Sequence, residues 1–377
     1  MMAAVENHSG LPHAWFPKVG DSGHTFDVLV VRGTFDLGGN GVTPTRAPQQ
    51  EPVVDGDQYD EPRGDDPVRA MLIQPGDRVL YKPQTDVCVT GHAHAPDAQA
   101  TQSWISGIQI GDCEVSVQLF GPRRFIKRWL GWRLTDATPV TEVPLTFECA
   151  FGGGYAIPLA QSDAFARIHK PDNPVGCGWL PDDGALDLLP PEERKVMAAA
   201  VAGVRDLPAP QIEDPATPIR SPFQQSPAFG LGPIAPWWAP RVHRQGTLDD
   251  DWLTKRCPAV PDDFDAAYYQ VAAPAFTLPT HLRGDEPLRL TNLLPDSRFE
   301  SRLPGWRVIA VASYADGSSD VAFPRIETVS IDLDKRRLSL VWRCCFDRFN
   351  PVRSIVIGAT DQPLARRPEG ELAEDLA

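Results

Sequence analysis

Proline is the residue that most constrains what this chain can fold into. The sequence contains 39 prolines in 377 residues, about twice the share of an average protein. Proline lacks a backbone N–H, so it is excluded from helix interiors and from central strands. Because the prolines are spread along the whole sequence, they favour many loops and short strands and argue against a helical bundle. We therefore predict a mainly β fold (a β-rich α+β fold), with antiparallel sheets in a sandwich- or barrel-like arrangement, long Pro-rich loops and one or two short helices.

Alternation of apolar and polar residues places several strands. Residues 24–37 are typical of one strand, or of two strands that bend at Gly33. Residues 103–121 indicate a hairpin that turns at Gly111–Asp112, and a second hairpin is predicted with its turn at Asp334–Lys335. Further strands are expected at 139–151, 306–314, 325–333, 337–346 and 353–358.

One helix and one irregular segment stand out between these strands. Residues 191–205 begin with proline, continue with acidic residues and then alanines, which predicts a helix. Residues 206–245 contain nine prolines together with several large aromatic residues. Because a disordered linker would be more polar, we expect this segment to be irregular but packed over the rest of the protein.

These patterns predict one large domain with less regular ends. We assign residues 1–20 to an N-terminal extension and residues 21–358 to one large β-rich domain, with a subdivision near 206–245. Residues 359–377 carry five acidic residues and little apolar content, so we predict an acidic disordered tail.

Charge and apolar content limit the class of partner. The formal net charge is −14, which disfavours binding to nucleic acid or to an anionic membrane. The N-terminus lacks the basic start and apolar run of a secretory signal, and no stretch approaches the roughly 20 apolar residues of a membrane span. None of the seven cysteines forms a C-x-x-C pair. We expect a cytoplasmic protein, although a vicinal disulfide between Cys344 and Cys345 remains an alternative to free thiols.

The segment YKPQTDVCVTGHAHAP, at 81–96, has the strongest resemblance to an active site. His92 and His94 would share one face of a strand, and Asp86 or Asp97 would be the third ligand of a metal-dependent hydrolase. Alternatively, Asp86 and His92 belong to a structural polar network. The sequence contains no nucleophile elbow, no H-E-x-x-H and no P-loop, so we favour the structural interpretation and predict a protein that is not an enzyme and uses no cofactor.

A basic and aromatic segment at 121–134 is the candidate for a partner surface. Cations interleaved with aromatic side chains suit a protein interface. The alternative is a sheet edge whose arginines pair with nearby carboxylates. The candidate partner-binding residues of this segment, with two tryptophans from the Pro-rich segment, are Arg123, Arg124, Lys127, Arg128, Trp129, Trp132, Trp237 and Trp238.

Eight sequence blocks, in order over residues 20–345, resemble the bacterial domain-of-unknown-function family 2169. They include KPQTDVCVTGHAHAP at 82–96, VPLTFECAFGGG at 143–154, NPVGCGW at 173–179 and PAFGLGPIAPWWAPR at 227–241. The resemblance implies an adaptor or chaperone of the type VI secretion system, with a toxic protein effector and a spike-tip protein as partners. A structural component of the spike is the other alternative. The resemblance carries over no catalytic residue and leaves the effector, the stoichiometry and the oligomeric state open.

Overall fold

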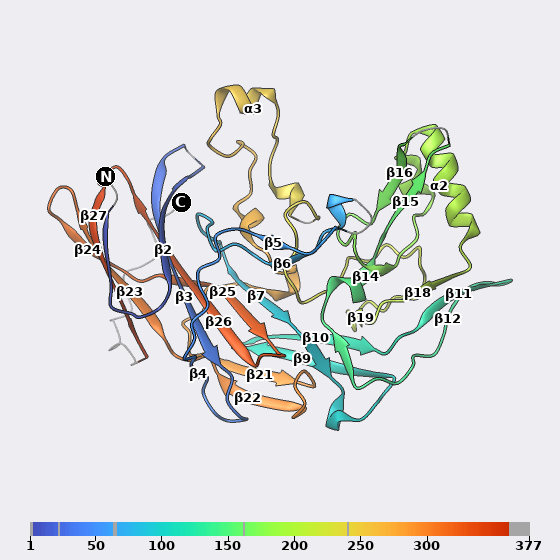
Figure 1. The fold of residues 1–377 in the computed structure, drawn as a ribbon, viewed down its shortest axis with the longest axis horizontal. Helices are drawn as coiled ribbons and strands as arrows, with labels where there is room; N and C mark the ends of the chain where they lie inside the picture. The colour runs from blue at the N-terminus through green and yellow to red at the C-terminus, as the bar shows by residue number, and fades with distance from the viewer. Residues whose placement is uncertain (1–2, 22, 63–65, 161–162, 240, 362–377) are drawn as a thin grey trace.

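The computed structural model describes residues 3–361 except 22, 63–65, 161–162 and 240 (Figure 1). In its largest sheet, the strand β7 (Thr85–Thr90), which belongs to the segment at 81–96, lies between two strands from other parts of the sequence. Within this sheet, β7 and β25 run parallel and the other neighbours run antiparallel. In order, the strands are β2 (His13–Val19), β3 (Thr25–Asp36), β26 (Arg337–Asp347), β25 (Arg325–Asp332), β7 (Thr85–Thr90) and β20 (Thr277–Leu278), and β4 (Thr45–Arg46) pairs with β3.

Two further sheets pack with this one around the main hydrophobic core. Apolar side chains from all three sheets meet there, including Val89 of β7, Ile108 of β9 and Ile355 of β27. The five-stranded sheet has the order β19 (Ile212–Glu213), β10 (Cys113–Phe120), β9 (Ser103–Ile110), β21 (Pro287–Thr291) and β22 (Arg298–Arg302). The four-stranded sheet has the order β1 (Ala4–Asn7), β27 (Val352–Thr360), β23 (Arg307–Tyr314) and β24 (Ser319–Ala322).

A smaller lobe with its own apolar cluster lies to the right in Figure 1. Phe125, Trp179 and Met197 are buried in this cluster. The lobe contains the sheet of β12 (Gly131–Leu134), β11 (Arg124–Arg128) and β18 (Asp206–Pro208), the hairpin of β15 (Gly154–Pro158) and β16 (Phe165–His169), and the helices α1 (Asp183–Asp187) and α2 (Pro191–Gly203). The remaining paired strands are β5 (Gln58–Tyr59) with β6 (Leu72–Gln74), β8 (His92–His94) with β13 (Glu142–Pro144), and β14 (Phe151–Gly152) with β17 (Cys177–Gly178).

The prediction of a mainly β fold with antiparallel sheets is confirmed, and so are both predicted hairpins and the helix at α2. Every sheet in the described part of the chain has two ends, so the open, layered arrangement is the one that forms. The described residues contain three α-helices, where one or two were expected. Two of the three, α1 and α3 (Asp250–Lys255), are very short. Each begins at an aspartate, Asp249 or Asp182, whose carboxylate accepts a backbone N–H of the first turn.

The N-terminal segment that was predicted as an extension contributes two strands to the sheets. The described residues of the 1–20 segment are built into the sheets, since β1 pairs with β27 and β2 pairs with β3. At the other end, β27 continues to Thr360, and residues 362–377 of the predicted tail lie outside the described residues. None of the helices in the described ranges has the length and apolar character needed to cross a membrane.

Candidate functional site

Asp86 lies on β7 in the middle of the largest sheet and is fully buried. Lys82 Nζ donates to its Oδ2 at 2.7 Å, and Gln270 Nε2 donates to its Oδ1 at 2.8 Å. The backbone N–H groups of Val271 and Ala272 donate to the same carboxylate at 2.8 and 3.2 Å. Because both oxygens already accept two hydrogen bonds, Asp86 holds the irregular segment around Val271 against the sheet.

A second buried ion pair adjoins this one. The Lys82 ammonium also donates to Thr328 Oγ1 at 3.0 Å, while its backbone N–H donates to Glu327 Oε2 at 3.0 Å. Glu327 forms an ion pair with Arg343. The network thus links β7, β25 and β26 through charges that are costly to bury unless they are paired.

His92 and His94 lie on β8 and face separate carboxylates. His92 Nδ1 is 2.9 Å from Asp334 Oδ2, and the His92 backbone N–H donates to Asp334 Oδ1 at 2.9 Å. Partial burial pushes the pKa of Asp334 upward, but the hydrogen bonds from the ring and backbone of His92 together outweigh it and lower that pKa. His94 Nδ1 lies 4.0 Å from Glu142 Oε2.

The residues of the alternative metal site are not brought together. Asp86 is buried with all its hydrogen bonds directed elsewhere, and the backbone N–H of Asp97 donates to Ser297 Oγ at 2.8 Å. Within the described ranges, no group of three His, Cys, Asp or Glu side chains is placed to hold a metal ion. Cys344 and Cys345 both carry free thiols, so they form no vicinal disulfide.

The basic and aromatic segment forms a hairpin of β11 and β12 that projects from the smaller lobe (Figure 1). At its tip, Trp129 is 91% exposed and Leu130 is 67% exposed. Gly131 completes the turn at φ +112°, a conformation that side-chain-bearing residues rarely adopt. Behind the tip, Lys127 Nζ lies 5.9 Å from the centre of the Trp132 ring. The hairpin therefore presents an apolar pair with cations close by.

The base of this hairpin is anchored in the protein, which corrects the prediction for Arg123. Its guanidinium is buried, stacks over Phe120, donates to the Pro210 carbonyl at 3.1 and 3.0 Å and forms an ion pair with Glu213. A buried side chain that is held by Pro210 and Glu213 is not available to a partner. Burial raises the pKa of Glu213, with Arg123 opposing the shift. Arg124 is exposed and pairs with Asp206 at 2.6 Å.

The tandem tryptophans of the Pro-rich segment, Trp237 and Trp238, were candidate partner-binding residues, and burial removes Trp238 from that set. Both indole N–H groups donate to the Val68 carbonyl at 3.1 Å. Trp238 is fully buried, with its ring edge-to-face against Phe147. Trp237 is half-buried and packs against Tyr59. The segment is irregular but packed, because its apolar residues are needed in the main core.

Comparison with known proteins places the chain in a family. A family model described as "Uncharacterized protein conserved in bacteria (DUF2169)" matches residues 22–343, most of the sequence. The chain belongs to DUF2169. The resemblance read from the ordered sequence blocks is thereby confirmed. No curated protein and no solved structure matches the chain.

Proposed function

We propose that this DUF2169 protein is a non-enzymatic adaptor that binds a type VI secretion effector and helps to load it onto the spike. The observation that carries the proposal is the exposed pair Trp129 and Leu130 at the tip of a hairpin with an anchored base. Tryptophan and arginine are the residues that most often dominate the free energy of protein association. The role in secretion rests on the resemblance of the sequence to adaptors of that system.

The charge on the hairpin indicates what the partner surface looks like. Among the described residues, the hairpin's cations form two ion pairs, Arg123 with Glu213 at the buried base and Arg124 with Asp206. Lys127, Arg128 and Arg133 extend along a hairpin that contains no acidic residue. An apolar pocket bordered by carboxylates on the effector would complement this tip. Elsewhere the chain is strongly acidic, which would steer a basic toxin domain towards it.

The test is co-expression with the effector encoded beside this gene, followed by affinity capture. A variant with Trp129→Ser and Leu130→Ser is compared with Leu188→Ser, a matched change at a side chain that is 87% exposed on the same lobe. Loss of a central aromatic anchor weakens binding by roughly thirtyfold, equivalent to about 2 kcal/mol. The control variant is expected to bind like the unmodified protein.

Two outcomes separate the parts of the proposal. If the unmodified protein forms no complex and deletion of its gene leaves effector levels unchanged, the adaptor function is refuted. If a complex forms but the Trp129 and Leu130 variant binds equally well, the adaptor function stands and the hairpin is excluded from the interface. Export of the protein into the culture supernatant together with the spike would instead favour a structural component.

A further inference from the structure

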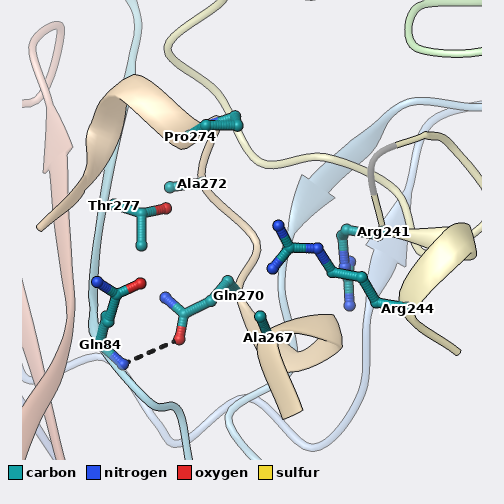
Figure 2. Close-up of a pocket in the computed structure, with 8 residues that line it drawn as sticks. All are labelled: Gln84, Arg241, Arg244, Ala267, Gln270, Ala272, Pro274 and Thr277. Atoms are coloured by element: carbon teal, nitrogen blue, oxygen red, sulfur yellow. Dashed lines mark hydrogen bonds between the residues drawn. The ribbon is translucent and has the colours of Figure 1, made fainter. Parts of the chain in front are cut away.

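A cavity of about 210 Å³ is lined in part by Gln270, the residue that also donates to Asp86 (Figure 2). Gln84 and Thr277 line one side, and Arg241 and Arg244 line the other. The side chain of Gln270, which lines the cavity, is held at both ends of its amide. Its Nε2 donates to Asp86 at 2.8 Å, and its Oε1 accepts the Gln84 backbone N–H at 3.2 Å. The buried network therefore fixes one wall of this cavity.

Arg241 is a buried cation that lacks a close anionic partner. It is 7% exposed. Its Nε donates to the Tyr268 carbonyl at 3.0 Å and its Nη1 to the Ile234 carbonyl at 2.6 Å. Both acceptors are neutral, and within the described ranges no carboxylate forms an ion pair with this guanidinium. Burial lowers the pKa of Arg241, with the more distant Asp57 among the groups that oppose the shift. A buried charge in this position is stabilised by an anion.

A second guanidinium enters the cavity from the solvent side. Figure 2 shows Arg244 extending from its short helix towards Gln270. Its Nη1 lies 3.8 Å from Asp265 Oδ2, at the long end of ion pairing, and the side chain is 39% exposed. Arg244 therefore retains donors for a ligand. The rest of the wall is mixed, since the Gln84 amide and the Thr277 hydroxyl stand beside the apolar surfaces of Ala272 and Pro274.

We propose that this cavity binds a carboxylate that has a short aliphatic group beside it. Two sources have this chemistry, a glutamate side chain with its methylenes and the C-terminal residue of a peptide with a small apolar side chain. Arg241 and Arg244 supply the cations, the Gln84 amide supplies a further donor, and Ala272 and Pro274 contact the aliphatic group. Guanidinium groups bind carboxylates through paired hydrogen bonds. The inference does not depend on the adaptor function, because it concerns a ligand site away from the hairpin.

Size and surrounding charge favour a carboxylate over a phosphate. The cavity is smaller than the roughly 300–1,000 Å³ of sites for drug-sized ligands, and it suits a single side chain. Asp57 and Asp86 act on Arg241 from a distance, and Asp265 is beside Arg244. These carboxylates would repel a doubly charged phosphate more strongly than a singly charged carboxylate.

In the test, small carboxylate probes and controls are titrated into the whole protein, and binding is monitored by NMR of the alanine methyl groups. Ala267 and Ala272 line the cavity, so their methyl signals report on it. The probes are N-acetylglutamate α-amide for the side-chain source, N-acetylalanine for the C-terminal source, neutral N-acetylglutamine α-amide and inorganic phosphate. We expect at least one carboxylate probe to shift both methyls with a millimolar Kd, and the neutral amide to bind at least about tenfold more weakly. The tighter of the two carboxylate probes identifies the source.

Variants locate the binding. Arg244→Gln is expected to weaken carboxylate binding at least about tenfold, whereas Arg194→Gln, at an exposed arginine on α2 with its own ion pair to Asp187, leaves it unchanged. Arg241→Gln removes the buried cation and is compared only if its circular dichroism shows a folded protein. The proposal is overturned if neither carboxylate probe shifts the two methyls, if phosphate or the neutral amide binds as tightly, or if Arg244→Gln has no effect.

Discussion

The segment from Lys82 to His94 and the hairpin from Arg123 to Leu134 use the same kinds of residue for opposite purposes. In the first, a lysine and an aspartate are sealed inside a sheet, where each has several partners. In the second, cations and tryptophan project from a lobe, and the tip contacts little of the protein. Each region also has an exception, because His92 pairs with Asp334 at the surface while Arg123 is buried.

The comparison shows that position in the fold, and not residue type, separates structural charges from available ones. Asp86 is part of a sequence pattern that resembles a catalytic site, yet its oxygens are occupied by Lys82, Gln270 and backbone N–H groups. Trp129 is part of a pattern that resembles a sheet edge, yet it has almost no contacts. The variants below measure this difference, from the largest expected loss of stability to the smallest.

Replacing Asp86 by alanine is expected to have the largest effect. Asp86→Ala leaves the Lys82 ammonium buried without its carboxylate and frees the backbone N–H groups of Val271 and Ala272. Breaking a buried pair from one side lowers the free energy of unfolding by about 3–5 kcal/mol. Urea denaturation measures the loss, with Asp112→Ala in an exposed turn as the control. A loss below about 1 kcal/mol would mean that Asp86 does not hold this segment.

Removal of the buried cation at the base of the hairpin is expected to have a smaller effect that depends on pH. Arg123→Met keeps the apolar stem but leaves Glu213 without its ion pair, at a cost of about 2 kcal/mol near neutral pH. Burial already raises the pKa of Glu213, and without Arg123 that pKa rises further.

The sign of this pH dependence follows from proton binding. A glutamate with a raised pKa in the folded state binds more protons folded than unfolded, so its contribution to stability falls as pH rises. The difference between Arg123→Met and the unmodified protein should therefore be small near pH 4 and grow towards pH 7. Urea midpoints measured across this range check it, and a difference that does not change with pH would contradict the assignment of the ion pair.

Local sequence pattern predicts some elements of the fold, and long-range contact decides others. The hairpin of β9 and β10 and the helix α2 were predictable because alternation, the glycine at 111 and the N-terminal proline act over a few residues. The parallel pairing of β7 with β25 was not, because the paired residues of the two strands lie more than 200 positions apart in the sequence. The hairpin of β15 and β16 was not predicted either.

The same distinction explains which site residues the sequence located. A polar role for Asp86 was predictable from its place on an apolar strand, but its partner Gln270 comes from a distant irregular segment. The burial of Trp238 could not be predicted from the sequence, because the Pro-rich segment has no regular spacing of apolar residues that would show which side chains face the core. Trp129 lies in a segment whose basic and aromatic composition made it a candidate; the structure shows that it is exposed, and its role in partner binding stays a prediction.

The pair of His92 and Asp334 at the surface should contribute little to the free energy of unfolding. Asp334→Asn is expected to cost about 0.5 kcal/mol at pH 6–7, since both partners are partly exposed. The pKa of Asp334 is lower in the folded protein, so its contribution is present above the ordinary aspartate pKa of about 4 and is lost as pH falls through the folded value. Thermal unfolding from pH 7 to pH 2.5 tests this, with Asp112→Asn as the control, and a cost that persists at the lowest pH would refute it.

The tip of the hairpin is expected to contribute least to stability, and this gives the sharpest contrast with Asp86. Trp129→Ser should change the free energy of unfolding by no more than about 0.5 kcal/mol, because a side chain that is 91% exposed loses little contact on replacement. Urea denaturation of this variant and of Leu188→Ser checks it. A loss above about 1 kcal/mol would show that the tip packs against the protein in solution, and Trp129 would then be structural like Asp86. If the stability is unchanged and effector binding is weaker, the Trp129 side chain contributes free energy to the complex and not to the fold.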